Sequence, residues 1–466
     1  MMELDSDNIK ASYAQDAAIT IRGLGGELRP FQRAGVAYAL RTERTFIADE
    51  PGLGKTCQAL ATIHASNAYP ALVVSPASLK LNWQREAQRW LPGAKVTVLS
   101  GVRPDYHQYK ADVVVCNYDI LAAHQRGLAQ RGFRGIVFDE AHNLKGRATQ
   151  RATAARALVK RARVRLPLTG TPILNGPEEF ASPLEIIERI DEFGGYAQFL
   201  GRYCGYSLAG QKVGPPAYLD ELNRLLRSRC YVRRRKADVL KDLPPKTRAV
   251  VPISITNRRD YEEAERSLAA EDDQRRGLRE AQQRAEADRL KGLVALGKIP
   301  AIVEWVKDFI HNGEKLVLFA YHKAVQHRLY QALAGSGAVH IFAEDDAVAR
   351  QSAVDRFQRE PKCKVIVCSL MAANAGLTLT AASNVAFAEM GWTPGIMDQA
   401  TDRVHRIGQV WPVTAWYLLA PGTVDDDIYE LIERKRRIVD AATDGQVADQ
   451  TPLLRELIDA MRRRRG

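Results

Sequence analysis

Two stretches of this chain alternate short runs of β-branched and other apolar residues with segments of helical pattern. The first stretch covers about residues 28–172, with the runs TFIA, ALVVSP, KVTVLS, DVVVCN, GIVFDE and VRLPLTG. The second covers about residues 299–420, with the runs KLVLFAY, AVHIF, KVIVCSL, NVAFAEM and VTAWYLL. Strands that alternate with helices form parallel sheets, because each parallel pair needs a crossover connection. The sequence therefore predicts an α/β fold with two tandem lobes, each built on a parallel sheet.

Different material lies between these stretches. Residues 181–243 mix aromatic residues, glycine and proline, whereas residues 258–291 are charged throughout with few apolar anchors. The charged stretch predicts a solvent-exposed helix or helical hairpin. A chain of 466 residues also exceeds what one hydrophobic core usually supports. We therefore predict five regions in this order: an N-terminal extension at 1–27, a first lobe at 28–180, helical insertions and a linker at 181–298, a second lobe at 299–440 and a basic tail at 441–466.

The chain is basic, with 67 Lys and Arg against 55 Asp and Glu, a formal charge of +12. Four clusters hold much of the excess: RARVR (161–165), RRRK (233–236), RKRR (434–437) and RRRR (462–465). Such clusters can neutralise phosphates and release counterions, which gives an affinity that depends on salt and not on sequence. A solvated basic surface is the alternative interpretation, and charge alone does not decide between the two.

Composition excludes several classes of protein. No apolar run approaches the ~18 residues of a bilayer span, and the N-terminus MMELDSDNIK is acidic and polar, unlike a secretory signal. We therefore expect a soluble, intracellular and cytoplasmic protein. Its six cysteines are scattered without a CxxC pair, which favours free thiols over disulfides or a zinc site.

A glycine-rich segment, DEPGLGKT, lies between the run TFIA and the helical pattern CQALATIHA. Gly52 and Gly54 let the backbone wrap a polyphosphate, and the amides at the helix start donate to its oxygens. Lys55 is placed to reach the β- and γ-phosphates, and the Thr56 hydroxyl is placed to bind Mg²⁺. Asp49 stands where the plain P-loop pattern has its first glycine. The segment predicts a nucleoside triphosphate site.

A second motif, DEAH, ends the apolar run GIVF. Asp139 is expected to bind Mg²⁺, and Glu140 is expected to orient the attacking water. Adjacent acids at a helix start can also serve only as caps. Because the DEAH pair follows DEPGLGKT at ordinary domain spacing, we favour ATP hydrolysis.

The order of these and other motifs resembles the Swi/Snf-type ATPases of helicase superfamily two, particularly the HepA-related branch that contains annealing helicases. The resemblance covers nearly the whole chain and rests on these segments: LRPFQRAGV (28–36), DEPGLGKT (49–56), VVSPASLKLNW (73–83), DEAH (139–142), LTGTP (168–172), RRRKADVLKDLPPK (233–246), VLFAYHKAV (317–325), GLTLTAAS (376–383) and WTPGIMDQATDRVHRIGQ (392–409). It implies two RecA-like P-loop lobes that share one nucleotide site and move on DNA.

The resemblance also implies roles for individual residues. Gln32 would read the adenine edge, for which an amide that both donates and accepts is suited. Arg403 and Arg406 would reach the γ-phosphate from the second lobe, and, being three apart on an expected helix, would share one face. A salt-bridge pair is the alternative for these arginines. The nucleotide-binding set is Gln32, Asp49, Gly52, Gly54, Lys55 and Thr56. The set implied to line the DNA path is Ser75, Pro76, Lys80, Thr169, Gly170, Thr171, Thr378 and Thr380.

Some features depart from the family pattern. Pro51 removes one loop amide where the family often has methionine. The segment HIFAEDDAVAR (340–350) lacks the expected glycine and hydroxyl residues. One contact of the second lobe with the backbone of a DNA strand is therefore not predicted. Trp83 and Trp392 are expected to pack in the core and not to stack on bases.

The predicted function is DNA-stimulated ATP hydrolysis that drives movement along double-stranded DNA and remodels DNA structures or protein–DNA complexes. The expected cofactors are ATP and Mg²⁺, and the expected partner is double-stranded or branched DNA bound by a monomer. A strand-separating helicase is the enzymatic alternative, and the segments WTPG, RVHRIGQ and RRRKADV favour translocation over it. A non-catalytic module that binds DNA or RNA polymerase is the other alternative, and the intact Lys55, Glu140 and Arg406 argue against it.

Overall fold

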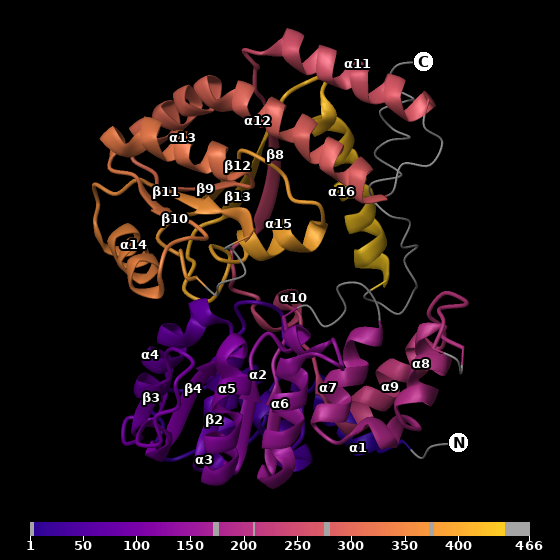
Figure 1. Cartoon of the computed structure of the whole chain (residues 1–466). Helices are drawn as coiled ribbons and strands as arrows, with labels where there is room; N and C mark the ends of the chain where they lie inside the picture. Colours follow the sequence, from indigo (N-terminus) through magenta and orange to yellow (C-terminus); the bar gives the residue numbers. More distant parts are fainter. Residues whose placement is uncertain (1–3, 171–176, 208–209, 275–279, 372–376, 443–466) are drawn as a thin grey trace. The chain divides into compact units, whose positions relative to one another are not determined.

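The computed structural model describes residues 4–170, 177–207, 210–274, 280–371 and 377–442 (Figure 1). These residues divide into two compact units, and the division falls between Asp242 and Leu243. Each unit has a parallel sheet of its own with flanking helices. The structure thus confirms the predicted α/β class with two tandem lobes.

The first unit contains a parallel sheet in the order β3-β4-β2-β5-β6. Its strands are β2 (Ala71–Ser75), β3 (Val96–Val98), β4 (Val113–Asn117), β5 (Gly135–Phe138) and β6 (Val164–Pro167). The central strands are buried along their whole length, as expected for continuous apolar runs that helices cover on both faces. A second, two-stranded parallel sheet joins β1 (Phe46–Ile47) to β7 (Tyr231–Val232).

The helices of the first unit begin where the sequence supplies a start signal. Pro30 occupies the first turn of α2, and the Thr149 hydroxyl accepts from the Ala152 N–H at the start of α6. The helices are α1 (Ser6–Tyr13), α2 (Pro30–Thr42), α3 (Lys55–Ala65), α4 (Lys80–Trp90), α5 (Tyr118–Arg131), α6 (Gln150–Leu158), α7 (Ala181–Ile186), α8 (Tyr196–Cys204), α9 (Leu219–Arg229) and α10 (Lys236–Val239).

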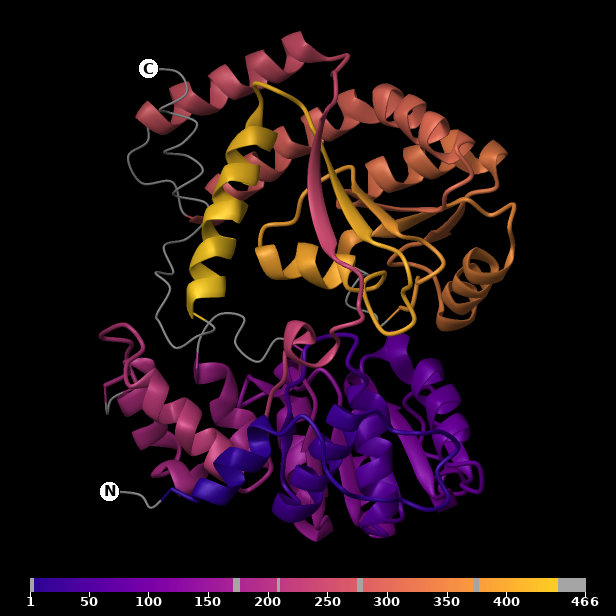
Figure 2. The same cartoon turned by 180° about the vertical axis from the view of Figure 1, so that it is seen from behind.

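The second unit contains a parallel sheet in the order β10-β11-β9-β12-β13-β8. Its strands are β8 (Lys246–Pro252), β9 (Leu316–Ala320), β10 (Val339–Ile341), β11 (Val365–Ser369), β12 (Asn384–Phe387) and β13 (Val413–Leu419). Its helices are α11 (Arg258–Gln274), α12 (Glu280–His311), α13 (Lys323–Leu333), α14 (Ala347–Arg359), α15 (Pro394–Thr401) and α16 (Val424–Ala442). Figure 2 shows β8 lying beside β13 at the edge of this sheet.

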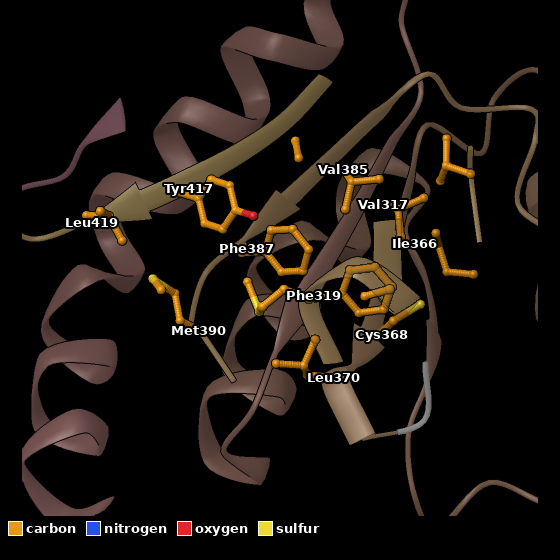
Figure 3. Close-up of a cluster of buried hydrophobic side chains, with 14 of the residues drawn as sticks. Val317, Phe319, Ile366, Cys368, Leu370, Val385, Phe387, Met390, Tyr417 and Leu419 are labelled. Atoms are coloured by element: carbon orange, nitrogen blue, oxygen red, sulfur yellow. The ribbon is translucent and has the colours of Figure 1, made fainter. Parts of the chain in front are cut away.

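Strand register builds the core of the second unit. Phe387 on β12 pairs with Phe319 on β9 and with Tyr417 on β13, so three rings stack across adjacent strands (Figure 3). Their centroids are 5.7 Å and 5.3 Å apart. Such stacked rings bury a large apolar area, which anchors the strands whose carboxyl ends carry the motifs.

Every strand expected in the two lobes is present, but the material between them differs from the expectation. Strand β8 was not predicted, although it has the alternating exposure of an edge strand. In the charged stretch, the described residues 258–274 and 280–291 are helical as predicted, yet Tyr261, Leu290 and Lys291 are buried. Helix α12 also runs unbroken through residue 299, where the second lobe was expected to begin.

The basic clusters are not the continuous surface patches that their sequence suggested. Arg165, Arg234 and Arg436 are each at most 4% exposed. Each forms an ion pair, with Glu188, Asp49 and Asp398 respectively. These arginines hold the fold together, because a buried guanidinium must be paired, and so they are not free to neutralise phosphates. The RRRR cluster lies outside the described residues.

No helix in the described part of the chain is long and apolar enough to cross a membrane. All six cysteines lie within the described residues, and each is buried with a free thiol. Burial raises the pKa of the Cys57 and Cys116 thiols to about 12, which keeps them protonated and unreactive near neutral pH.

Candidate active site

The loop DEPGLGKT connects β1 to α3 and has the backbone geometry of a phosphate cradle. Gly52 and Gly54 have φ values of 90° and 79°, which residues with a Cβ rarely adopt. A Cβ on Gly54 would also lie 2.5 Å from Nε2 of Gln32. The Lys55 ammonium donates to the backbone carbonyl of Asp49 at 2.9 Å, so the lysine folds back over the loop. The amides at the start of α3 thus surround a site suited to an anion.

Asp49 fixes this loop to the interior of the first unit through buried hydrogen bonds. Its side chain is fully buried, and Oδ1 accepts from the Arg234 backbone N–H at 2.9 Å and from Arg234 Nε at 3.0 Å. Oδ2 accepts from Arg234 Nη2 at 2.7 Å and from Gln58 Nε2 at 2.9 Å. Glu50 accepts from the Lys236 N–H at 2.7 Å. Since Asp49 has no exposed surface, we propose that it positions the loop and does not touch nucleotide directly.

Breaking this pair should destabilise the loop strongly. Arg234→Met leaves the Asp49 carboxylate buried without its cation, a change that costs about 3–5 kcal/mol in comparable sites. Hydrogen–deuterium exchange of peptides that span Phe46–Thr56 should report a loss of that size in opening free energy. The matched control is Arg235→Met, because Arg235 forms an exposed pair with Asp238 that is worth about 1 kcal/mol or less. Equal protection loss in both variants would contradict the role assigned to Arg234.

The DEAH motif follows β5, next to the phosphate loop. One oxygen of Asp139 accepts from Trp83 Nε1 at 2.7 Å, and the other accepts from the Glu140 N–H at 3.0 Å. Burial and the neighbouring Glu140 raise the pKa of Asp139 to about 6, against the opposing effects of the Trp83 N–H and the Lys55 ammonium. The carboxylate is therefore ionised near neutral pH and is an oxygen ligand suited to Mg²⁺.

Glu140 has the features of a residue held for function. Its φ is 50°, in the left-handed region that non-glycine residues adopt at a cost of about 1 kcal/mol or more. Its Oε2 is buried, and no described residue forms a hydrogen bond with it. His142 Nδ1 lies 3.5 Å away, and burial lowers the pKa of His142, so the ring is neutral. A buried carboxylate oxygen without a hydrogen bond is the acceptor that an attacking water requires.

The start of the LTGTP motif borders the phosphate loop. The Thr169 N–H donates to the Ile47 carbonyl at 3.2 Å, and the Thr169 side chain is buried. A Cβ on Gly170 would lie 2.7 Å from Pro51 Cγ and 3.2 Å from Lys55 Nζ. Both residues were expected on the DNA path, but in the structure they pack beside the nucleotide loop. Thr171 lies outside the described residues.

Gln32 connects the start of α2 to the phosphate loop through the two ends of its amide. Its Oε1 accepts from the Arg29 N–H at 2.9 Å, and its Nε2 donates to the Leu53 carbonyl at 3.1 Å. The side chain is 4% exposed. The adenine contact stays a prediction, and it requires these hydrogen bonds to be exchanged or shared.

Arg403 and Arg406 do not lie on a helix, contrary to the expectation. Helix α15 ends at Thr401, and the following residues form turns in which the Leu379 N–H donates to the Arg403 carbonyl at 2.9 Å. Arg403 is 7% exposed, whereas Arg406 is partly exposed and donates to the Leu377 carbonyl at 3.0 Å. Of the two, Arg406 is the better candidate to reach a ligand.

The remaining residues expected on the DNA path differ in accessibility. Ser75 is fully buried, while Pro76 at the next position is partly exposed, and the DNA contact of both stays a prediction. Lys80 donates to the Leu99 carbonyl at 2.7 Å, and burial lowers its pKa. Thr378 is partly exposed, and Thr380 Oγ1 accepts from Gln358 Nε2 at 3.3 Å.

Two site residues were not found from the sequence. Arg234 was interpreted as part of a basic patch, and Trp83 as core packing alone. The core packing of Trp83 is confirmed, since it is 1% exposed, but its N–H is also directed at Asp139. A signal was available for Trp83, because a buried tryptophan needs a partner for its N–H.

These residues fit Mg²⁺ and a nucleoside triphosphate. Hard oxygen donors from Thr56 and Asp139 suit Mg²⁺, and Lys55 with the loop amides suits the phosphates. The buried, hydrogen-bond-free oxygen of Glu140 suits a water molecule.

Comparison with known proteins gives consistent matches. The model of the SNF2-related domain matches residues 31–301, and that of the helicase conserved C-terminal domain matches residues 298–408. A SWI/SNF-related matrix-associated actin-dependent regulator of chromatin subfamily A-like protein 1 from Xenopus tropicalis is 34% identical over 90% of this chain and 45% of its own length. The human DNA annealing helicase and endonuclease ZRANB3 is 31% identical over 91% of this chain and 41% of its own length. The chain thus spans less than half the length of these relatives.

Two solved structures of the Sulfolobus solfataricus SWI2/SNF2 ATPase core, one in complex with double-stranded DNA, also match. Each aligns with 91% of this chain, and the alignments cover 95% and 92% of the solved chains. The TM-scores are 0.45 and 0.46, with sequence identities of 24% and 25%.

Proposed function

Because this chain belongs to the SNF2-related family, we propose that it is an ATP-hydrolysing motor that moves along double-stranded DNA. In doing so it remodels DNA structures or protein–DNA complexes. The observation that carries the proposal is the buried oxygen of Glu140 without a hydrogen bond, beside an ionised Asp139 and an intact phosphate loop. Relatives whose names include DNA annealing helicase support DNA as the substrate.

Hydrolysis in this proposal depends on positioning, because phosphoryl transfer needs little covalent help from the protein. Gly52, Gly54 and Lys55 hold the phosphates, and Thr56 with Asp139 supplies ligands for the metal. Bound Mg²⁺ would neutralise charge on the phosphate oxygens.

Glu140 accepts a hydrogen bond from the attacking water and directs it at the γ-phosphate. Arg406 supplies positive charge to the transition state from the second lobe, and Arg403 supports it. Hydrolysis then requires the lobes to close, which is how ATP turnover and movement on DNA become linked.

The DNA contact in this proposal is made mainly to phosphates. We propose that DNA contacts the surface around Pro76 in the first unit and, separately, the surface around Thr378 in the second. Lys80 would join the first of these surfaces when its hydrogen bond to Leu99 is released. Contacts of this kind position a duplex without reading its sequence, so binding should weaken steeply as salt rises.

The test compares ATP turnover with duplex, forked and single-stranded DNA of equal nucleotide content. We expect duplex DNA to stimulate turnover most, without release of a labelled strand from the duplex. Strand release at the rate of ATP turnover would favour a strand-separating helicase instead. Turnover that no DNA changes would contradict the motor, and turnover no greater than that of Lys55→Ala would favour a non-catalytic binding module. Lys55→Ala, which removes the phosphate ligand, is the control for contaminating ATPases.

A further inference from the structure

Trp83 makes a contact that its place in the core does not require. It lies in the first turn of α4, and its ring packs among buried residues of the first unit. Its Nε1 donates to Oδ2 of Asp139 at 2.7 Å, between residues 56 positions apart in the chain. Because the other oxygen of Asp139 accepts from the Glu140 N–H, the carboxylate is held from two sides.

The second tryptophan of α4 shows that this contact is specific to one position. Trp90 is also buried, but its Nε1 donates to Glu86 on the same helix at 3.1 Å. An indole N–H can therefore find an acceptor on its own helix, whereas the N–H of Trp83 donates to Asp139, the proposed metal ligand. Hydrogen bonds from a neighbouring group orient a ligand and tune its affinity for the metal.

Helix α4 also connects the metal ligand to the surface proposed to bind DNA. The chain leaves β2 at Ser75, passes through Pro76 and a short 3₁₀ turn (Ala77–Leu79), and enters α4 at Lys80. Lys80 and Trp83 are one helical turn apart, about 5 Å along the axis. Because Lys80 and Trp83 share the first turn of α4, a DNA contact that shifted the start of this helix would also shift the indole relative to Asp139.

From this geometry we propose that Trp83 is a positioning residue that orients Asp139 for Mg²⁺ and couples DNA binding at the start of α4 to the metal site. The coupling rests on the proposed function, since it assumes that DNA contacts this surface. The orientation of Asp139 does not, because it requires only that the site binds a metal with a nucleotide.

The first experiment measures binding of a fluorescent ADP analogue against Mg²⁺ concentration, without DNA, for the parent, Trp83→Phe and Trp90→Phe. We expect Trp83→Phe to need ~10–100-fold more Mg²⁺ for half-maximal binding, the usual effect of losing such a neighbouring contact. Binding in EDTA should be unchanged, because the phosphate loop is intact. Trp90→Phe should match the parent in both conditions. A parent-like Mg²⁺ requirement in Trp83→Phe would overturn the proposal.

The second experiment repeats the Mg²⁺ titration with saturating duplex DNA. We expect DNA to shift the Mg²⁺ requirement of the parent and of Trp90→Phe, and to leave that of Trp83→Phe unshifted. A full shift in Trp83→Phe, with duplex-stimulated turnover in the parent, would overturn the coupling. Absence of duplex stimulation in the parent would overturn the proposed function and the coupling together, while the titration without DNA still decides the orientation of Asp139.

A further variant covers the case in which Trp83→Phe does not fold. Site-specific replacement of Trp83 by 3-benzothienylalanine keeps the shape of the ring and removes only the N–H donor. Its thermal unfolding should match that of the parent, since the packing is unchanged. The same increase in Mg²⁺ requirement is expected, and a parent-like value would overturn the proposal.

Discussion

Glu140→Gln should reduce DNA-stimulated ATP turnover by about 10²–10⁴-fold, the range that a general base contributes. The substitution keeps the volume and removes the charge that orients the water. Nucleotide binding should persist, because the ligands of the phosphates and the metal remain. Glu140 also raises the pKa of Asp139, so its neutralisation favours the ionised, metal-binding form of Asp139. The measurement is steady-state turnover with saturating duplex DNA, with nucleotide affinity determined in parallel.

Glu188→Gln is a matched control for this prediction. Glu188 has a left-handed φ of 57°, close to that of Glu140, but its carboxylate pairs with Arg165 away from the phosphate loop. Arg165 also donates to the Ala162 and Ile187 carbonyls, so it keeps hydrogen-bond acceptors when Glu188 becomes glutamine. Backbone strain and loss of one carboxylate are then similar in the two variants. We expect Glu188→Gln to retain parent-like turnover. Parent-like turnover in Glu140→Gln would mean that another group activates the water.

Arg406→Ala should abolish DNA-stimulated hydrolysis and leave ATP bound. An arginine supplied to a phosphoryl transition state is worth about 10³–10⁵ in rate, far more than an exposed surface charge contributes. ATP affinity should change by a small factor only, because Lys55 and the glycine amides stay in place. In the structure Arg406 is partly exposed, and its Nη1 donates to the Leu377 carbonyl at 3.0 Å. Single-turnover hydrolysis with and without duplex DNA measures the effect.

Arg258→Ala is the matched control in the same unit. Arg258 also donates to backbone carbonyls, those of Pro421 and Gly422, so its loss removes comparable hydrogen bonds and one positive charge. Parent-like stimulation is expected in this variant. If Arg406→Ala also showed parent-like stimulation, the first lobe would be a self-sufficient ATPase, and hydrolysis dependent on closure would have to be abandoned.

The two lobes and the phosphate and metal motifs followed from the sequence alone, and the reason is local. Strands such as ALVVS and VVVCN are continuous apolar runs, and DEPGLGKT and DEAH are short segments in which neighbouring residues act together. The helix start at Lys55 needs only Gly54 in a left-handed conformation directly before it. Strands and motifs that are formed by neighbouring residues can therefore be predicted from the sequence.

Other features depended on residues that are distant in sequence, and only the tertiary structure decided them. The pairing of Asp49 with Arg234 spans 185 residues, and nothing in the local pattern of RRRK separates a buried arginine from a surface one. The helical pattern ends at Thr401, and the turns that follow include a hydrogen bond from the Leu379 N–H to the Arg403 carbonyl, a contact without a local signal. Likewise, neither the burial of Ser75 nor the hydrogen bond from Trp83 to Asp139, which are 56 residues apart, has a local signal. Sequence order therefore determined which chemistry this chain carries, and long-range packing decided which side chains are available to perform it.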